Sequence, residues 1–344
     1  MGERADSALI TVGIIGAGGI ANAHLPAWRD LGVRVLVYSV DEGAAGLIER
    51  HGAGEAVTSL AELLERADIV DICSPTYTHR DLVLQAVAAR RPVICEKPLG
   101  LDPEQAREIM SACAAAGVSL FPAQVVRFFP EYRALQQQVA AGIVGTPAVL
   151  RFTRIAERPK REWFHQPALA GGIILDQMIH DLDMARWLAG EVTEVFARSV
   201  TRAADTGEVT AAQVVMQHAS GAISSAFGAW ASAGTSFRTA FSLAGTAGYL
   251  RHDSADNRPV RVDAPAPGQP RGGLLPRNLG RSPFHDQLGE FLSAIRDGAP
   301  TRVSAFDGVQ AVAIATAASE SARAGRPVRL GDAWTSTQPE ERSA

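Results

Sequence analysis

The chain contains 344 residues, of which 47% are hydrophobic and 20% charged, and its formal net charge is −4. This composition is typical of a globular protein with about two domains. It excludes the basic field that attracts nucleic acid, and the sequence lacks the apolar run of roughly 20 residues that spans a membrane. The first residues lack the long apolar stretch of a signal peptide, and three scattered cysteines indicate buried thiols, so a cytoplasmic protein is predicted.

The first third of the chain alternates short apolar runs with helical patterns. This alternation predicts a parallel sheet wound on both faces, which binds its ligands at the carboxyl ends of the strands. Ser59 is placed to cap the third of the helices. The predicted strands cover 10–15, 33–38, 69–73, 93–95 and 119–123, and the predicted helices run from the glycines to 31, then to 51, and over 59–66, 78–89 and 102–116.

The pattern changes near residue 145. Consecutive strand-like runs without crossover helices predict a second domain, of α+β type, with a large, mostly antiparallel open sheet. The predicted strands are 148–155, 194–201, 211–218, 222–230 and 238–244. One helix over 172–189 interrupts them, 253–283 is predicted to be a long loop, and helices over 284–296 and 306–324 could pack back on the first domain. The predicted domains are 1–125, a Rossmann dinucleotide-binding domain, and 126–344, a domain for substrate binding and oligomerisation.

A glycine-rich turn follows the first predicted strand. Gly16, Gly18 and Ala21 give the pattern G-x-G-x-x-A between a strand and a helix. Gly16 permits a tight turn, Gly18 allows the backbone to approach a pyrophosphate, and the helix N-terminus that starts near Gly19 and Ile20 faces the phosphates. The turn predicts a bound dinucleotide.

The end of the second strand bears on the choice between NAD and NADP. An acid that holds the adenine ribose of NAD is expected there, but Ser39 occupies the position and Asp41 follows two residues later. A small hydroxyl tolerates a 2′-phosphate, which slightly favours NADP, although no arginine follows to bind that phosphate. Asp41 could instead cap the next helix.

Two further motifs stand at strand ends. Ser74, Pro75 and His79 belong to the sequence SPTYTH after the third long strand, where they are predicted to border the nicotinamide, although His79 could lie on the surface. Glu96 and Lys97 end the next strand. A charged pair there is costly to bury without a purpose, so the Lys97 ammonium is predicted to stabilise charge on a substrate oxygen. The alternative is a solvated ion pair.

The helix over 172–189 carries Asp176 and His180 four residues apart, on one face, with Asp183 nearby. A histidine is a natural proton acceptor near neutral pH, and a carboxylate beside it orients the ring. Metal ligation and a buried structural histidine are the alternatives. Because no further histidine or cysteine has a matching spacing, no metal site is predicted.

With these motifs, the chain resembles the Gfo/Idh/MocA family, which is named for glucose–fructose oxidoreductase, inositol dehydrogenase and a rhizopine catabolism protein. The resemblance covers nearly the whole chain. It rests on six segments in the right order: GIIGAGGIA, SPTYTH, CEKPLG, RFFPEYRAL, GGIILDQMIHDLDMARWL, and DGVQAV with SARAGRPVRL. The family motif around the histidine usually has glycine where this chain has Met178, and its form here looks closer to the inositol dehydrogenase branch.

The resemblance implies a role for each candidate residue. Lys97 polarises a substrate hydroxyl, His180 exchanges its proton and Asp176 supports the site. Self-association as a homodimer or homotetramer through the open sheet is also implied. The predicted cofactor contacts are Gly16, Gly18, Gly19, Ile20, Ser39, Ser74, Pro75, His79, Glu96, Lys97 and Gln124, and the predicted substrate contacts are Arg127, Trp163, Asp176 and His180.

These features predict an NAD(P)-dependent dehydrogenase that acts on a secondary hydroxyl or carbonyl of a sugar or cyclic polyol. Two alternatives stay open. One is a regulatory protein that binds nucleotide and sugar without turnover. The other is a redox-neutral glycosidase that holds its nucleotide tightly and does not consume it. The fold by itself does not choose among them.

Overall fold

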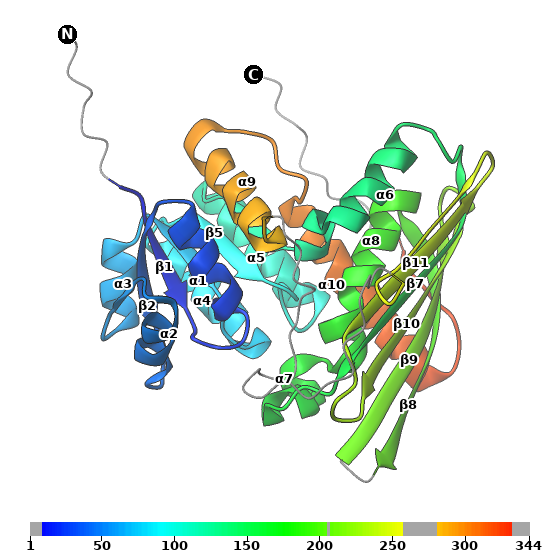
Figure 1. Cartoon of the computed structure of the whole chain (residues 1–344), viewed down its shortest axis with the longest axis horizontal. Helices are drawn as coiled ribbons and strands as arrows, with labels where there is room; N and C mark the ends of the chain where they lie inside the picture. Colours follow the sequence, from blue (N-terminus) through cyan, green and yellow to red (C-terminus); the bar gives the residue numbers. More distant parts are fainter. Residues whose placement is uncertain (1–8, 205–206, 257–280, 332–344) are drawn as a thin grey trace. The chain divides into compact units, whose positions relative to one another are not determined.

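The computed structural model of the chain describes residues 9–204, 207–256 and 281–331. It divides into two compact units. The first contains the described residues within Met1–Gly100, Glu104–Phe128 and Gly280–Val309, and the second contains those within Leu101–Pro103, Phe129–Leu279 and Gln310–Ala344. Each unit is built around its own sheet (Figure 1).

The sheet of the first unit has six strands in the order β3-β2-β1-β4-β5-β6, and every pair is parallel. The strand order reverses between β1 and β4, which creates the switch point where such sheets bind their ligands. The inner strands β1, β4 and β5 are buried along their whole length, as expected for a covered parallel sheet. The strands are β1 Thr11–Ile15, β2 Arg34–Tyr38, β3 Glu55–Ala56, β4 Ile69–Ile72, β5 Val93–Glu96 and β6 Leu120–Ala123.

Helices flank this sheet. The predicted cap of α3 is confirmed, because the Ser59 hydroxyl accepts the backbone N–H of Glu62 at 3.1 Å. The helix α9 comes from far along the sequence and packs against α1; its Phe291 ring stacks on Phe121 with centroids 5.1 Å apart. The helices are α1 Ala21–Asp30, α2 Gly43–His51, α3 Leu60–Arg66, α4 His79–Ala88, α5 Pro103–Ala116 and α9 Pro283–Asp297, with 3₁₀ turns η1 Thr76–Thr78 and η2 Val125–Phe128.

The second unit contains a seven-stranded sheet in the order β12-β11-β7-β10-β9-β8-β13. Its pairs are antiparallel except β10 with β7, which is parallel because several elements separate these strands along the chain. The strands are β7 Pro147–Glu157, β8 Val192–Ala204, β9 Gly207–His218, β10 Ile223–Ala231, β11 Arg238–Gly245, β12 Tyr249–Asp253 and β13 Val328–Arg329. The predicted fold class is confirmed in both sheets.

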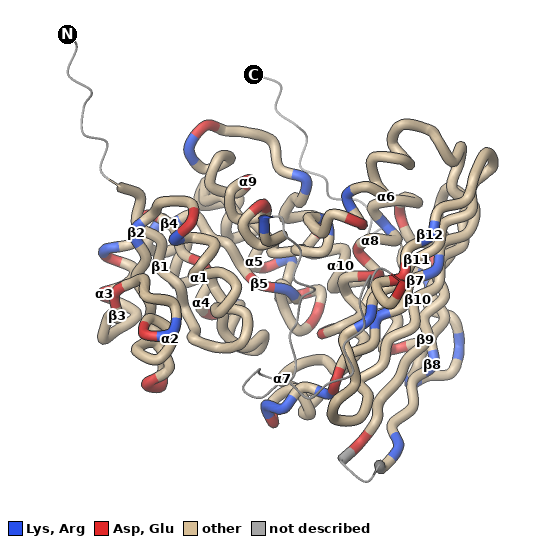
Figure 2. Tube along the Cα trace, viewed as in Figure 1, with Lys and Arg blue, Asp and Glu red and all other residues tan. Residues whose placement is uncertain are grey.

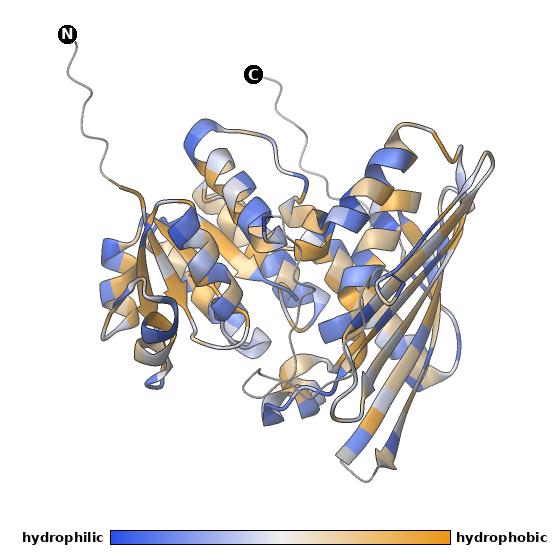
Figure 3. Ribbon diagram, in the orientation of Figure 1, coloured by the Kyte–Doolittle hydropathy of each residue, from blue (hydrophilic) through white to orange (hydrophobic). Residues whose placement is uncertain are grey.

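Helices of the second unit pack against one face of its sheet. Leu150 and Phe152 of β7 are buried toward that face, whereas Val149 and Arg151 between them are exposed on the other. Figure 3 shows this alternation of hydrophobic and hydrophilic residues along the long strands. The helices are α6 Pro130–Ala140, α7 Pro167–Ala170, the π-helix η4 Ile174–Met178, α8 Ile179–Ala189 and α10 Ala305–Ala324, with the 3₁₀ turn η3 Glu162–His165; α10 starts in the first unit.

The short strands β3, β12 and β13 and the helix α6 were not predicted. Most of the predicted loop over 253–283, namely residues 257–280, lies outside the described residues. Among the helices in the described part of the chain, none combines the length and the apolar content needed to cross a membrane. Figure 2 shows acidic and basic positions interspersed along both units.

Candidate active site

The glycine turn joins three strand ends of the first sheet. The backbone N–H of Gly16 donates to the carbonyl oxygen of Tyr38 at 2.8 Å. The φ of Gly16 is +104°, and a Cβ at this residue would lie 2.8 Å from the carbonyl oxygen of Cys73. Only glycine fits here, because any side chain would collide with the backbone that follows β4.

Beyond Gly16 the turn leaves open space. A Cβ at Gly19 would meet no atom within 4 Å. The Gly18 carbonyl accepts the Asn22 amide at 2.8 Å, and Ile20 is the N-cap of α1, with no side chain that caps the first turn. The first N–H groups of α1 therefore face an uncrowded turn, which is the arrangement that suits a pyrophosphate.

The structure brings Asp41 beside Ser39 at the end of β2. The Ser39 hydroxyl donates to Asp41 Oδ1 at 2.5 Å, and the same oxygen accepts the Gly43 N–H at 3.0 Å. Asp41 therefore satisfies an N–H group at the start of α2, the capping alternative considered from sequence. The contact also places a carboxylate next to the position where the ribose-binding acid was expected.

The loops after β4 and β5 are joined by His79. Its ring nitrogens lie 3.0 Å from the Ser74 carbonyl oxygen and 2.8 Å from the Pro98 carbonyl oxygen. Burial lowers the pKa of His79, with a smaller contribution in the same direction from the charge of Lys97. The suggestion that His79 lies on the surface is wrong, since the side chain is buried. The ring therefore connects the loop after β4 to the loop after β5.

Ser74 and Pro75 occupy the turn between these anchors. Both are half-buried, and the Ser74 hydroxyl shares a hydrogen bond of 2.7 Å with the Thr78 hydroxyl. Thr78 in turn donates to the Pro75 carbonyl at 2.7 Å. The hydroxyls therefore stabilise the turn itself, and Thr78 does not cap the following helix with its side chain.

Lys97 directly follows β5 and is half-buried. Its backbone N–H donates to Oε2 of Glu96 at 3.0 Å, and the Lys97–Pro98 peptide bond is cis. Glu96 itself is buried, which differs from the alternative of a solvated pair at the strand end. The Glu96 carboxylate is thus bonded to the backbone of the lysine beside it.

Two polar residues follow β6. Gln124 is buried, and its Oε1 atom has no hydrogen-bond partner among the described residues. The Arg127 guanidinium is also buried; it donates to the Arg302 carbonyl at 2.7 Å and pairs with Asp307 at 3.2 Å. Gln124 thus offers an acceptor to a ligand. The structure uses Arg127 to tie η2 to the start of α10, and its role in substrate binding stays a prediction.

In the second unit, Asp176 and His180 do not share one continuous α-helix. Asp176 is buried within the π-helix η4, whereas His180 is half-buried in the first turn of α8. The expected α-helix over 172–189 is corrected in this respect. π-turns are rare and occur often at functional sites, and no sequence pattern announces them.

Side chains from the neighbouring positions anchor this segment to the sheet. The Gln177 amide donates to the carbonyls of Arg154 and Ala229, at 3.0 and 3.3 Å. Met178 packs over Gly228 of β10, where a Cβ would overlap the Met178 side chain. Met178, which stands where the family motif usually has glycine, therefore packs against a glycine of β10.

A buried ion pair completes the anchor. Arg154 of β7 donates to both carboxylate oxygens of Asp181, at 3.0 and 2.9 Å, and Asp181 directly follows His180. Burial by itself would lower the pKa of Arg154, but the Asp181 charge raises it above its usual value. Trp163 lies elsewhere in this unit, half-buried in η3, with its ring stacked on Phe164 at 3.8 Å.

Sequence reasoning missed two groups of buried polar residues. The first is His24 of α1 with Asp71 of β4, and the second is Arg154 with Asp181. Asp71 offered a signal, since it interrupts an otherwise apolar strand and a buried carboxylate requires a partner. The partners themselves are distant in sequence and only the fold reveals them.

Comparisons with known proteins agree with this geometry. A model described as an oxidoreductase family with an NAD-binding Rossmann fold matches residues 10–124, and a model of the GFO/IDH/MocA C-terminal domain matches residues 132–251. The myo-inositol 2-dehydrogenase of Thermotoga maritima is 30% identical over 93% of this chain and 98% of its own. The D-apiose dehydrogenase of Paraburkholderia graminis is 32% identical over 92% and 88%. The solved structure of GenD2 from gentamicin A biosynthesis, in complex with NAD, matches with a TM-score of 0.83 at 27% identity, over 94% and 97%.

Proposed function

The chain belongs to the Gfo/Idh/MocA family of oxidoreductases, and on that premise we propose that it transfers a hydride between a nicotinamide nucleotide and a secondary hydroxyl of a sugar or cyclic polyol. The observation that carries the proposal is the position of Lys97, half-buried at the carboxyl end of β5 in an NAD-binding Rossmann domain. A lysine there suits the stabilisation of charge on a reacting oxygen.

The residues of the first unit fit a dinucleotide. Gly16 stands where a Cβ would collide with the backbone after β4, and the Gln124 oxygen is buried with no hydrogen-bond partner among the residues that the structure describes. We propose that the turn with Gly18, Gly19 and Ile20 holds the pyrophosphate and that Gln124 accepts an N–H group of the nicotinamide end. When bound, the nucleotide supplies the carbon that accepts or releases the hydride.

We further propose that NAD is preferred over NADP. The Asp41 carboxylate lies against Ser39, so a 2′-phosphate would meet a negative charge, whereas a ribose hydroxyl could donate to it. This reverses the slight preference for NADP that the sequence suggested. Binding constants for both nucleotides with the Asp41→Asn variant test it. The substitution should bring the Kd values for NAD and NADP closer together. Equal Kd values in the unchanged protein would contradict the proposal.

The protein residues would act as follows during oxidation. The Lys97 ammonium stabilises the negative charge that develops on the substrate oxygen. His180 accepts the hydroxyl proton and returns it in the reverse reaction, and the Asp176 carboxylate supports the protonated ring. Arg127 and Trp163 stay candidates for substrate contact.

The test is absorbance at about 340 nm, the band of the reduced nicotinamide, with purified protein, NAD⁺ or NADP⁺, and a panel of inositols, aldoses and sugar acids. Reduction of the nucleotide by one panel member would support the dehydrogenase and show its substrate class. Confirmed nucleotide binding without reduction by any member would contradict it. That outcome would favour the regulatory protein or the redox-neutral glycosidase.

We also propose that the chain self-associates through the open face of the second sheet and works in a reducing, cytoplasmic environment. Val149, Val215 and Ile223 lie on this face and are exposed, and all three cysteines are buried free thiols. Val215→Asp should dissociate the assembly in light scattering. Ile143→Asp, at an exposed apolar residue outside the sheet, is the matched control. An unchanged mass for Val215→Asp would contradict the proposed interface.

A further inference from the structure

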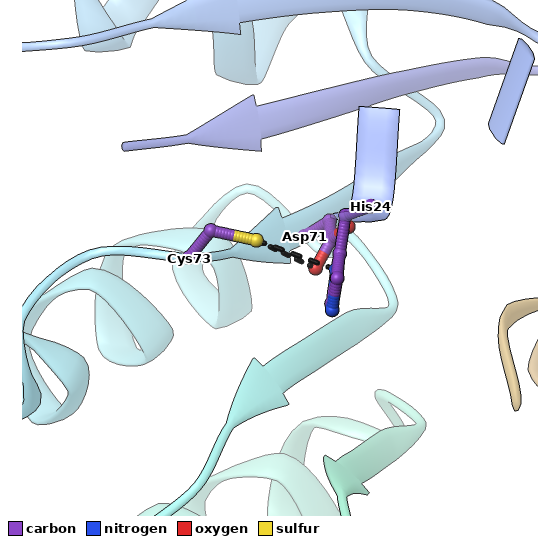
Figure 4. A group of neighbouring side chains, drawn as sticks. All are labelled: His24, Asp71 and Cys73. Atoms are coloured by element: carbon purple, nitrogen blue, oxygen red, sulfur yellow. Dashed lines mark hydrogen bonds and ion pairs between the residues drawn. The ribbon is translucent and has the colours of Figure 1, made fainter. Parts of the chain in front are cut away.

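A buried group of titratable residues lies beneath the strand ends of the first sheet. His24 and Asp71 are 0% exposed and Glu96 is 4% exposed. His24 Nδ1 is 2.9 Å from Asp71 Oδ2, and His24 Nε2 is 3.1 Å from Glu96 Oε1. Figure 4 shows the His24 ring, which extends from α1, against Asp71, with Cys73 just after the end of β4. We call His24, Asp71 and Glu96 the His24 triad.

We propose that His24 is a buried imidazolium that holds the Glu96 carboxylate in place, and that His24 and Asp71 thereby position Lys97. The proposal rests on the function proposed above for Lys97. It assigns no contact with substrate to the triad.

The proton count follows from the geometry. An ionised carboxylate only accepts hydrogen bonds, so a ring nitrogen that faces one must carry a proton. Both nitrogens of His24 face carboxylates, Asp71 on one side and Glu96 on the other. A doubly protonated ring satisfies both contacts, whereas a neutral ring leaves one carboxylate facing a lone pair.

The surroundings support the charged form. Burial lowers the pKa of His24, but the charge of the Asp71 carboxylate and its hydrogen bond to the ring more than offset this, so the pKa stands well above its usual value. Among the residues that the structure describes, the titratable side chains that contact His24 are Asp71, Cys73 and Glu96. The helix α9 contributes the uncharged ring of Phe284, at 5.5 Å.

The triad reaches Lys97 through the second oxygen of Glu96. Oε1 of Glu96 bonds to His24, and Oε2 accepts the backbone N–H of Lys97 at 3.0 Å. The carboxylate therefore spans the distance between α1 and the residue after β5. If His24 loses one proton, the remaining N–H serves either Asp71 or Glu96. In the tautomer protonated on Nδ1, the Oε1 contact of Glu96 is lost, and the carboxylate that accepts the backbone N–H of Lys97 is held less firmly.

The triad is not needed for the stability of the fold, because apolar side chains could fill the same space without burying charge. Two carboxylates and an imidazolium taken out of water carry a desolvation penalty that ion pairing often fails to recover, and apolar residues of similar volume are frequently as stable. The presence of the triad beneath a proposed catalytic residue is consistent with selection for positioning.

The same atoms could be considered for a metal. His24 Nδ1, a carboxylate oxygen of Asp71 and Cys73 Sγ lie within 4.8 Å of one another. However, the Trp28 indole donates to Asp71 Oδ2 at 2.7 Å, and burial, followed by the Asp71 charge, raises the pKa of the Cys73 thiol to about 12. A thiol that keeps its proton is a poor ligand, so the arrangement favours shared protons.

The direct test reads the charge of His24 in the intact protein without any substrate. Protein labelled with ¹⁵N in histidine, with the His24→Gln variant for assignment, should show both ring nitrogens of His24 protonated at about pH 7.5, a full unit above the ordinary histidine pKa. A neutral ring at that pH would overturn the proposal. Stoichiometric metal in the purified protein by mass spectrometry would overturn it as well.

The functional test uses Asp71→Asn, which keeps the shape and the acceptor for Trp28 but removes the charge that raises the His24 pKa. His24 should then lose its proton in the neutral range. We expect kcat of the variant, relative to the unchanged protein, to fall about tenfold between about pH 6 and about pH 8, while the Kd for the nucleotide changes less than about twofold.

The matched control is Trp28→Phe, which removes an uncharged hydrogen bond from the same buried group. It should lower stability and leave the shape of the pH profile as in the unchanged protein. Parallel profiles for Asp71→Asn and the unchanged protein would overturn the positioning role. If no substrate turns over at all, the proposed function fails, and the ¹⁵N measurement still decides the charge of His24.

Discussion

The two units anchor their candidate catalytic residues in different ways. In the first, Lys97 is held through its backbone by Glu96, whose carboxylate bonds to His24. In the second, the segment around His180 is held by the guanidinium of Arg154 on Asp181. A guanidinium stays protonated at every physiological pH, whereas an imidazole can lose its proton. The first anchor is therefore sensitive to pH, and the second is not.

The largest expected effect is on turnover. Lys97→Ala removes the ammonium but leaves the backbone N–H that Glu96 binds, so kcat should fall by about 10²- to 10³-fold with the nucleotide Kd nearly intact. Lys97 and Lys160 are the lysines of the sequence, and Lys160 is exposed in the second unit, so Lys160→Ala is the control. Normal turnover of Lys97→Ala would refute its assigned role.

The second anchor is tested by Arg154→Met. The substitution leaves the Asp181 charge buried without its partner, and the free energy of unfolding should fall by about 3–5 kcal/mol in urea titrations. Arg158→Met is the matched control, because it breaks a more exposed pair with Glu208 and should cost at most about 1 kcal/mol. Adding Asp181→Leu to Arg154→Met should restore much of the loss. Equal costs for the two arginines would show that burial does not distinguish them.

A smaller loss of stability is expected from a substitution at the contact between η4 and the sheet. Gly228→Ala places a methyl group against Met178, so unfolding should become easier by about 1–3 kcal/mol, and kcat should fall because Met178 lies two residues before His180. Met178→Ala should cost less in the Gly228→Ala background than alone, as a double-mutant cycle measures. Strict additivity would argue against this contact.

The smallest expected effect is a change with pH in how much each anchor contributes to the free energy of unfolding. The pKa of His24 is raised in the folded protein, so its stabilisation is complete below the unfolded pKa of about 6.5 and is lost as the pH rises through the folded pKa. The difference in unfolding free energy between the unchanged protein and His24→Gln should shrink along that rise. The difference for Arg154→Met should stay constant over the same range, and parallel curves would remove the distinction.

Much of this fold could be predicted from the sequence because its signals are local. The apolar runs located five of the six strands of the first sheet and the five long strands of the second. Six motifs in order placed the chain in its family, which the comparisons confirm. Strands of two residues, such as β3 and β13, are too short to leave a periodic pattern. The alternation of polar and apolar residues can be detected only in longer strands.

The motifs of the candidate site could be predicted from the sequence, but the buried residues that hold those motifs in place could not. Asp71 and Glu96 reach His24 across 47 and 72 residues, and Arg154 reaches Asp181 across 27. Such pairs depend on strand order and register, which one sequence does not state. The π-turn at Asp176 likewise depends on how Gln177 and Met178 meet the sheet.

The late position of α9 in the chain has a consequence during synthesis. Phe284 of this helix lies against His24, and Phe291 lies against Phe121 and Phe128, so a segment near residue 290 completes the unit that begins the chain. A ribosome releases the glycine turn and all six strands of the first sheet long before this helix. The nascent nucleotide-binding unit must therefore wait, with aromatic side chains uncovered, while six of the seven strands of the second sheet are translated. The unit that begins the chain is therefore completed only after most of the second unit has been translated.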